Sequence, residues 1–395
     1  MRLLILNLIL FSCAHTTLSS QTINDTILNK IKEKARETHS DAVIIIKGET
    51  MVYEDYFGKE EKPIYIASAG KSLVSLAIGK LIDNKQLDSL DQPIYTLFPE
   101  WKQGQKREVT IRMLLNHTSG LQNNPNPMIE LEPAPDFQIN NVIKLALTAE
   151  LSSIPGDKFN YNNKAVALLG GIVEKASGKR FDHFFIEEFY KPMDIANYNW
   201  IQDKEGNPTT HGAFVIKPSD FIKFGQLILN EGLYNGKRLI SESWIEESFK
   251  QGQEFDVRFG LLWWRLPEYE QRIIDEDIWD SWKKANVNKD FLKQIKPLKH
   301  KLYNNKYDYF KDLKDLFGDR WNSVLNKQLP HSVMSSKRIY GKRIVAYYAD
   351  GYRGNYLVII PEKNIVAIRC ADPDGFDAQT DSFTDFVSLI SELSN

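Results

Sequence analysis

A serine and a lysine three residues apart, Ser68 and Lys71, open an apolar run that extends from Leu73 to Ile82. The run is continuous and long enough to predict a buried helix. Because residues i and i+3 share one helix face, we expect the Lys71 amine to lie within reach of the Ser68 hydroxyl. The free N–H groups at a helix N-terminus favour developing negative charge. A nucleophile, a nitrogen base and such a helix end together suit acyl transfer.

A second candidate group is the phenol of Tyr161, on a loop between the turn-forming pair Pro155-Gly156 and a helical pattern that begins at Lys164. A loop tyrosine is commonly a solvated surface residue. Read functionally, this phenol is a proton carrier if nearby lysines stabilise the phenolate. Two residues further on, Asn163 is placed to hydrogen-bond either the lysine amine or a substrate amide.

Composition excludes several other classes of protein. The formal net charge of -2 does not indicate a nucleic-acid partner. The seven scattered histidines and the two cysteines, Cys13 and Cys370, do not form a zinc motif or a disulfide framework. Gly70-Lys71-Ser72 resembles the end of a phosphate-binding loop, but Tyr65 stands where that loop requires glycine. We therefore expect no metal and no cofactor.

The first twenty residues, 1–20, read as a targeting segment, in which Arg2 precedes the short apolar run Leu3 to Phe11. Two processing routes fit this pattern. In one, the sequence before Cys13 is a lipoprotein signal and Cys13 becomes a lipidated N-terminus. In the other, cleavage follows Ser19-Ser20. Both routes predict an exported protein, either periplasmic or anchored to a membrane by lipid.

Strand-like segments lie near both ends of the remaining chain, and helical patterns lie between them. The expected strands are 42–47, 51–57, 343–348, 356–360 and 365–370. The expected helices include 22–38, 111–115, 142–147, 164–177, 219–230 and 382–393. This order favours an α+β fold, with an antiparallel sheet built from both chain ends, flanking helices and an inserted, mostly helical lobe.

Taken together, the motifs resemble those of the serine β-lactamase and penicillin-binding-protein superfamily. The closest branch is the class C β-lactamase-like one, which includes family VIII esterases, D-aminopeptidases and 6-aminohexanoate-oligomer amidases. The motifs that carry the resemblance, in the family's order, are Ser68-x-x-Lys71, Leu114-Leu115-Asn116-His117-Thr118-Ser119-Gly120-Leu121, Tyr161-x-Asn163, Lys217-Pro218-Ser219-Asp220 and Gly354-Asn355-Tyr356. They extend from about residue 40 to the C-terminus, which implies a single β-lactamase-like domain over 21–395.

The resemblance also implies a mechanism. Ser68 would form an acyl-enzyme, and Lys71 and Tyr161 would share the proton transfers. Which of these two is the general base stays open. Asn163 would support the site, and the oxyanion would be held by the backbone N–H groups of Ser68 and Ala349. The residue Ala349 follows from an ungapped match of the strand to the family.

The third family motif, Lys-Thr-Gly, is absent, because the same match places Ala-Tyr-Tyr at 346–348. The family lysine binds the carboxylate of penicillins, a charge-assisted contact worth about 1.5–3 kcal/mol. We therefore expect esters or non-lactam amides as substrates and at most weak β-lactamase activity. The segment Gly351, Tyr352 and Arg353 is expected to contact substrate. Arg353 is a candidate replacement for the missing cation, although loop arginines are often merely solvated.

Residues 265–342 interrupt the family pattern and are too long for a simple connection. Helical patterns and the residues Trp279, Trp282 and Trp321 predict a lobe with a small core of its own. A sharper hypothesis makes this insertion a lid over the acyl or leaving-group pocket.

Three functions remain open at this stage. The first is an exported serine hydrolase acting on small esters or amides through Ser68. The second is a D-amino-acid peptidase or carboxypeptidase directed at peptidoglycan-type peptides. The third is a non-catalytic ligand-binding relative, although such proteins normally lose one member of the set formed by Ser68, Lys71 and Tyr161. In each case the partner is a small molecule or a peptide.

Overall fold

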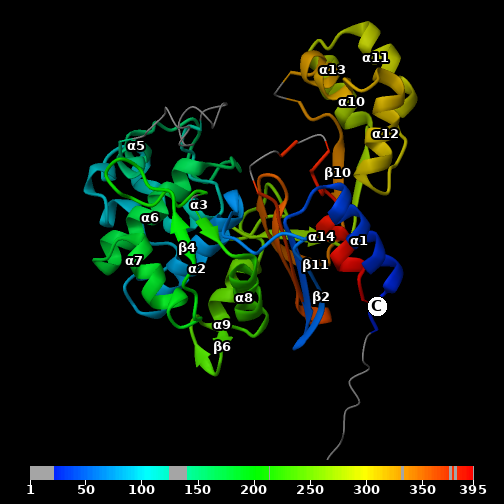
Figure 1. The fold of residues 1–395 in the computed structure, drawn as a ribbon. Coiled ribbons are helices and arrows are strands. Elements are labelled where there is room, and N and C mark those ends of the chain that lie inside the picture. Colours follow the sequence, from blue (N-terminus) through cyan, green and yellow to red (C-terminus); the bar gives the residue numbers. More distant parts are fainter. Residues whose placement is uncertain are drawn as a thin grey trace, which may run out of the picture.

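The computed structural model describes residues 22–123, 140–212, 214–330, 333–372, 376–377 and 380–394. Its ribbon is drawn in Figure 1. The predicted signal segment 1–20 and the candidate lipidation residue Cys13 lie outside the described residues. Among the helices that are described, none combines the length and the apolar character needed to cross a membrane.

Within the described residues, the largest sheet has six strands in the order β2-β1-β13-β12-β11-β8, and every neighbouring pair is antiparallel. Its strands are β1 (Ala42–Lys47), β2 (Thr50–Asp55), β8 (Trp264–Pro267), β11 (Ile344–Gly351), β12 (Asn355–Ile360) and β13 (Ile365–Cys370). The N-terminal strand β1 pairs with the C-terminal strand β13 from Ala42↔Cys370 to Lys47↔Ile365. The predicted closure of the sheet by both chain ends is therefore confirmed.

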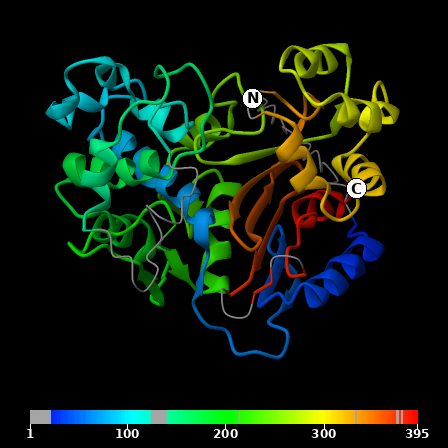
Figure 2. The same cartoon turned by 90° about the horizontal axis from the view of Figure 1, so that it is seen from above.

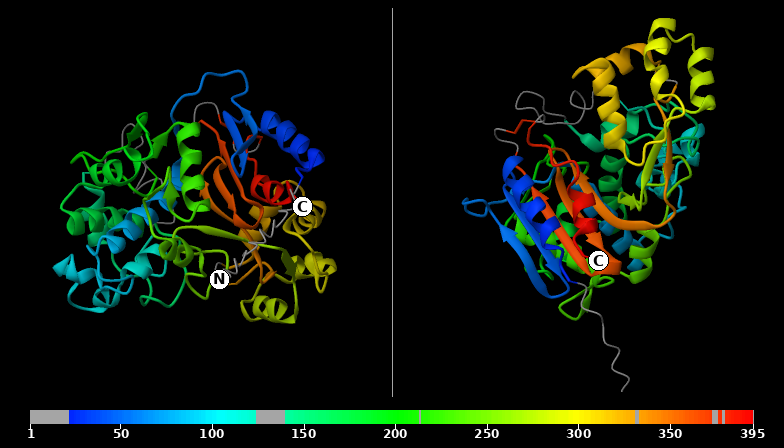
Figure 3. Two further views of the ribbon diagram at one scale, coloured as in Figure 1. Left: turned by 90° about the horizontal axis from the view of Figure 1, so that it is seen from below. Right: turned by 90° about the vertical axis from the view of Figure 1, so that its right-hand side faces the viewer.

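Both faces of this sheet are covered, which explains why β12 and β13 are apolar at nearly every position. Side chains alternate between the faces, so Val366 and Ile368 join one core, whereas Ile365 and Ala367 join a second. Helix α8 (Pro218–Leu229) packs on the first face. Helices α1 (Asp25–Glu37) and α14 (Phe386–Glu392) cover the opposite face, as Figures 1 and 3 show.

A helical lobe continues the first core beyond α8, and Figure 2 shows it beside the sheet from above. Its α-helices are α2 (Gly70–Asp83), α3 (Ile111–Leu115), α5 (Val142–Thr148), α6 (Asn163–Ser177), α7 (Phe181–Phe185) and α9 (Glu242–Phe249). Shorter helical turns are η1 (Ala67–Ala69), η2 (Ile94–Thr96), η3 (Pro99–Trp101), η4 (Gln105–Glu108) and η5 (Ile186–Tyr190). Its short strands are β3 (Ile64–Tyr65), β4 (Tyr198–Trp200), β5 (Phe214–Ile216), β6 (Leu233–Tyr234) and β7 (Lys237–Arg238).

The predicted insertion begins later than the sequence indicated. Residues 265–267 belong to β8, which pairs with β11 from Trp264↔Tyr348 to Pro267↔Ile344. The inserted lobe is joined to the main body by the paired strands β9 (Glu270–Ile273) and β10 (Lys337–Tyr340). Its helices are α10 (Glu276–Lys284), α11 (Lys289–Ile295), η6 (Lys296–Leu298), α12 (Lys306–Phe317) and α13 (Trp321–Gln328).

The inserted lobe has a hydrophobic core of its own, as predicted. Trp279 and Trp282 are buried in that core, and Trp321 packs against it. The indole of Trp282 also donates to the Met334 carbonyl at 2.8 Å. In Figure 1 the lobe stands above the sheet, away from the helices that carry the first core.

Candidate active site

Ser68 lies in the turn η1, directly before the first residue of α2. Lys71 is buried in the first turn of α2, and its Nζ donates to Ser68 Oγ at 2.8 Å. The same amine donates to the backbone carbonyl of His211. The backbone bends sharply here, because Ala67 has a φ of 50°, in the left-handed region. The spacing of the serine and the lysine therefore produces the contact that the sequence predicted.

Tyr161 completes this arrangement, because its phenol is hydrogen-bonded to the Ser68 side chain. Lys71 Nζ lies 5.2 Å from the centre of the Tyr161 ring. Burial raises the pKa of the phenol, the Ser68 hydrogen bond lowers it, and the carboxylate of Asp350 raises it further, for a net rise. Tyr161 thus holds its proton in the resting site. The structure brings Ser68, Lys71 and Tyr161 together, as the sequence analysis expected.

The loop that carries Tyr161 is held by His117. The His117 carbonyl accepts from Asn160 N at 2.8 Å, and His117 Nδ1 accepts from Asn162 N at 3.3 Å. Its ring packs on Tyr161 with the ring centres 4.6 Å apart. Burial, with the Lys71 charge adding to it, lowers the pKa of His117 to about 3. The imidazole is therefore neutral and has a structural role.

Two neighbouring asparagines at the start of α6 have different roles, since Asn162 caps the helix and Asn163 does not. Asn162 caps the helix, with Oδ1 accepting from Ala165 N at 3.1 Å and Nδ2 donating to the Leu121 carbonyl at 2.8 Å. Asn163 Oδ1 is buried and has no hydrogen-bond partner within the described part of the chain. The predicted contact from Asn163 Oδ1 to the lysine amine is therefore not formed, and the alternative contact with substrate stays a prediction.

The end of β11 approaches the Ser68 turn through Gly351, two residues beyond Ala349, the predicted oxyanion residue. A Cβ added to Gly351 would lie 2.2 Å from the Ile66 carbonyl oxygen and 3.1 Å from Ala69 N. Only glycine allows so close an approach of two backbones. Ala349 lies two residues earlier, paired with Leu357 and buried in the first core.

Backbone geometry places the open N–H group at Tyr352. The Gly351 carbonyl accepts from Gly354 N at 3.0 Å, so it points toward β12. In a trans peptide the next N–H, that of Tyr352, points in the opposite direction, away from β12. Ala349 has the same strand parity as Gly351, so its N–H is directed to β12 instead.

The glycine that approaches the Ser68 turn is thus Gly351, preceded on the strand by Ala349 and Asp350. Residues 346–351 contain no lysine, so the family lysine is absent from this whole stretch. The sequence signal for the turn after this strand was the glycine at 354, which has a φ of 74° in the structure.

The predicted substrate-contacting residues beyond Gly351 lie in that turn. The Tyr352 side chain is 60% exposed. The Arg353 guanidinium packs 5.3 Å from the Tyr352 ring centre and 5.4 Å from that of Phe376. Nε and Nη1 of Arg353 are buried and have no hydrogen-bond partner among the described residues. Arg353 is thus held against aromatic rings, unlike a solvated loop arginine.

A row of aromatic rings that the sequence analysis missed flanks the phenol. Trp264 of β8 stacks on Tyr161, with the ring centres 6.3 Å apart. Tyr348 of β11 also stacks on Trp264, with the ring centres 6.4 Å apart. Phe259 packs edge-on against Trp264 at 4.8 Å and against Phe159 at 5.2 Å. These rings come from distant chain segments, so no local pattern could have grouped them.

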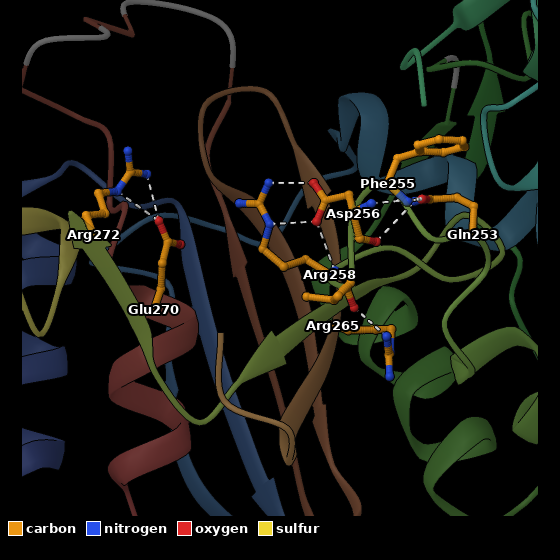
Figure 4. A network of polar contacts seen from close by, with 8 residues as sticks. Gln253, Phe255, Asp256, Arg258, Arg265, Glu270 and Arg272 are labelled. Carbon is orange, nitrogen blue, oxygen red and sulfur yellow. Dashed lines mark hydrogen bonds and ion pairs between the residues drawn. The ribbon is translucent and has the colours of Figure 1, made fainter. Parts of the chain in front are cut away.

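Figure 4 shows two ion pairs, Asp256 with Arg258 and Glu270 with Arg272. Asp256 and Arg258 pair at 2.6 Å, and the guanidinium lies 6.0 Å from the Trp264 ring centre. Glu270 and Arg272, at the base of the insertion, pair at 2.7 Å. Each pair joins residues two positions apart in one segment, and the Glu270 charge also acts on Arg258.

Asp350 of β11 interacts electrostatically both with Lys306 of the inserted lobe and with the Tyr161 phenol. Burial raises the pKa of Asp350 to about 6, and the Lys306 charge opposes that rise. Lys306 is the first residue of α12 in the inserted lobe. The insertion therefore acts electrostatically on the strand that closes the site.

Other chemistry is poorly supported. Burial raises the pKa of the Cys370 thiol to about 12, so the thiol is protonated and inert at neutral pH. In the parts of the chain that the structure describes, His, Cys, Asp and Glu side chains form no group of three suited to a metal ion.

Comparisons of the sequence with known proteins indicate one family. The family profile described as Beta-lactamase matches residues 28–381. The 6-aminohexanoate-dimer hydrolase of Paenarthrobacter ureafaciens is 22% identical over 245 residues, covering 58% of this chain and 61% of the relative. Protein flp of Staphylococcus aureus strain MRSA252 is 25% identical over 211 residues, covering 50% of this chain and 41% of the relative. The chain thus spans about three fifths of the length of the hydrolase and about two fifths of the length of protein flp.

Two solved structures share the fold. A Bacteroides dorei DSM 17855 protein provisionally named a β-lactamase has a TM-score of 0.65 and 17% identity, covering 94% of this chain and 99% of that one. A penicillin-binding protein from Bacillus halodurans has a TM-score of 0.57 and 15% identity, covering 87% and 94%. These likenesses confirm the predicted α+β fold, with the sheet built from both chain ends and a helical insert.

Proposed function

We propose a function for this chain from one premise: the chain belongs to the beta-lactamase family. It is a hydrolase of that family, related to 6-aminohexanoate-dimer hydrolase. We infer that it cleaves small esters or amides through an acyl-enzyme on Ser68. The observation that carries this proposal is the hydrogen-bonded set of Lys71 Nζ, Ser68 Oγ and the Tyr161 phenol.

In the proposed reaction, Ser68 Oγ attacks the substrate carbonyl carbon while its proton passes to the Lys71 and Tyr161 pair. The negative oxygen of the tetrahedral intermediate accepts from the backbone N–H groups of Ser68 and Tyr352. Tyr161, which holds a proton at rest, protonates the leaving alcohol or amine. Water then attacks the acyl group, and Ser68 recovers its proton.

The preference for esters and non-lactam amides rests on the third motif. Residues 346–351 contain no lysine, whereas β-lactamases carry in this motif the lysine that binds the penicillin carboxylate. Without that charge-assisted contact, worth about 1.5–3 kcal/mol, lactam binding loses roughly one to two orders of magnitude. The aromatic row of Trp264, Tyr348 and Phe259 offers an apolar wall to an acyl or leaving group instead.

A second candidate function is cleavage of D-amino-acid peptides. The observation that favours it is Arg353, whose Nε and Nη1 donors have no partner in the described residues and lie in the turn beside the site. A guanidinium with spare donors suits the terminal carboxylate of a peptide.

A substrate panel tests these alternatives. Purified protein and its Ser68→Ala variant are compared on short p-nitrophenyl esters, a linear aminohexanoate amide, a D-Ala-D-Ala peptide and nitrocefin. We expect the ester or linear amide to be turned over faster than nitrocefin, and the variant to lose about 10⁴-fold or more. Faster turnover of nitrocefin would refute the assignment, and dominance of the D-peptide would select the second candidate.

We also propose that the protein is exported, because residues 2–11 have the pattern of a signal segment. Lipidation at Cys13 and cleavage after Ser19-Ser20 are the two routes. Cell fractionation with radiolabelled palmitate, on the full chain and on Cys13→Ala, separates them. Label in the wild type alone supports the lipid anchor, whereas a soluble exported product in both supports simple cleavage.

A further inference from the structure

Arg369 is a fully buried arginine that the proposed mechanism does not use. It lies near the end of β13, opposite Val43 of β1 and Tyr356 of β12. No ion pair joins it to a carboxylate within the described residues, and burial lowers its pKa to about 10. Because a buried guanidinium without an ionic partner is costly, its retention requires many satisfied hydrogen bonds.

Those hydrogen bonds go to oxygens of three chain segments that meet at this end of the sheet. The bonds are Nε to Ser40 Oγ at 2.9 Å, Nη2 to the Thr38 carbonyl at 2.9 Å and to the Asp381 carbonyl at 2.8 Å, and Nη1 to the carbonyls of Gly354, at 3.0 Å, and Arg353. One guanidinium therefore connects the end of α1, the C-terminal segment and the turn between β11 and β12.

The last two acceptors belong to the turn that carries the open N–H of Tyr352. Carbonyl oxygens of Arg353 and Gly354 bond to a single nitrogen of Arg369, on the opposite side of the turn from β11. A Cβ added to Gly354 would lie 2.6 Å from Arg369 Nη1. The glycine and the arginine thus fit one another, and the turn has no other charged anchor in the described residues.

We propose that Arg369 is a positioning residue for the oxyanion site. By holding the Arg353 and Gly354 carbonyls it fixes the turn, so that the Tyr352 N–H stays directed at the space beside Ser68. This inference rests on the proposed function of Ser68. Arg369 does not touch substrate, and its effect appears only when negative charge develops on the carbonyl oxygen.

The test compares an ester with its thionoester, in which sulfur replaces the carbonyl oxygen. Sulfur is a weak hydrogen-bond acceptor, so the thionoester gains little from the oxyanion donors. In Arg369→Met we expect kcat for the ester to fall about 10- to 100-fold with KM nearly unchanged, and kcat for the thionoester to fall much less. Arg369→Lys is expected to recover little, because one ammonium cannot serve all the acceptors.

Ser40→Ala is the matched control, because it removes one bond of the same guanidinium at a distance from the turn. We expect it to keep the wild-type ratio of ester to thionoester rates. Should Arg369→Met fail to fold, Gly354→Ala displaces Nη1 from the turn and should produce the same selective loss.

If Arg369→Met leaves the ratio of ester to thionoester rates unchanged, whether both rates fall equally or neither falls, the proposal is overturned and Arg369 is a structural residue. Failure of the proposed function has a different signature. In that case the wild type hydrolyses neither substrate and Ser68 is not acylated.

Discussion

At the scale of single residues, the site depends on two proton carriers of different character. Lys71 donates to Ser68 Oγ at 2.8 Å and is buried at the start of α2. Tyr161 is hydrogen-bonded to the same hydroxyl, and burial keeps its phenol protonated. This difference suits a division in which one of the two accepts the serine proton and the other supplies a proton to the leaving group.

Replacing Tyr161 with phenylalanine removes the hydroxyl and keeps the ring stacking on Trp264. We expect kcat to fall about 10²- to 10⁴-fold, as for the loss of a general acid–base group, with little change in thermal stability. Steady-state kinetics on a p-nitrophenyl ester measures this loss. Tyr347→Phe, on β11 but stacked on Phe249, is the control and should retain activity. A loss below tenfold in Tyr161→Phe would contradict the assignment.

The ionisation of Asp350 makes the stability of the folded protein fall as the pH rises. Burial raises its folded pKa from 3.8 to about 6, so the folded state binds a proton more tightly than the unfolded state. The contribution of Asp350 to stability is therefore fully present below pH 4 and is lost as the pH rises to 6. Asp350→Asn should unfold at a higher temperature than the wild type above pH 6 and show no such gain at pH 4. Calorimetry at pH 4 and pH 8 measures both, and equal differences at the two values would refute this.

The sequence predicted Ser68, Lys71 and Tyr161 because each lies in a local pattern, a helix start or a loop before a helix. The choice of Ala349 as the oxyanion residue depended instead on strand register, which is set by pairing with β12 and by the turn at Gly354. Those contacts are not local, and a slip in register leaves the strand pattern unchanged.

At the scale of elements, two backbone segments form the site by touching without side chains between them. The end of β11 meets the turn η1, and Gly351 is the point of contact with Ile66 and Ala69. Helix α2 then directs Lys71 back at Ser68 from within the first core. The precision of the site therefore depends on how closely a strand and a turn approach each other.

Gly351→Ala tests this contact. Its methyl group would lie 2.2 Å from the Ile66 carbonyl oxygen, so the strand must withdraw from the Ser68 turn. We expect kcat to fall more than about tenfold through the displaced oxyanion donor, with a smaller effect on KM. Gly341→Ala is the control, because its methyl group meets the Glu268 side chain, which can move. Full activity in Gly351→Ala would show that the close approach is not required.

Element prediction from sequence succeeded where the pattern was strong and local. The strands 42–47 and 365–370 were predicted with the bounds of β1 and β13. The edge strand β8 was instead assigned to the insertion, since four residues ending at Pro267 show no strand pattern. Only its pairing with β11 identifies it.

At the scale of the whole molecule, one sheet separates two cores, and the inserted lobe adds a third. The chain ends must pair before the sheet is complete, which makes the main body a single cooperative unit. The inserted lobe is joined through one pair of strands, β9 and β10, beside the ion pairs of Arg258 and Arg272. That placement allows it to shape the site without contributing to the main cores.

Removing the lobe tests its role. Residues 274–336 can be replaced by a two-residue turn, because Ile273 and Lys337 are paired across β9 and β10. We expect the shortened protein to unfold cooperatively and to hydrolyse a short acetyl ester. Its preference between short and long acyl esters should change several-fold, because the deletion removes Lys306, whose charge acts on Asp350, together with the helices of the lobe. An unchanged preference in the folded variant would show that the lobe is not a lid.

The central claim is a covalent acyl-enzyme on Ser68. Intact-protein mass spectrometry after reaction with a fluorophosphonate, followed by peptide mapping, measures it directly. The account predicts one added phosphonyl group, located on the peptide that contains Ser68 and absent from Ser68→Ala. Equal labelling of the alanine variant, or a label found only on another residue, would contradict it.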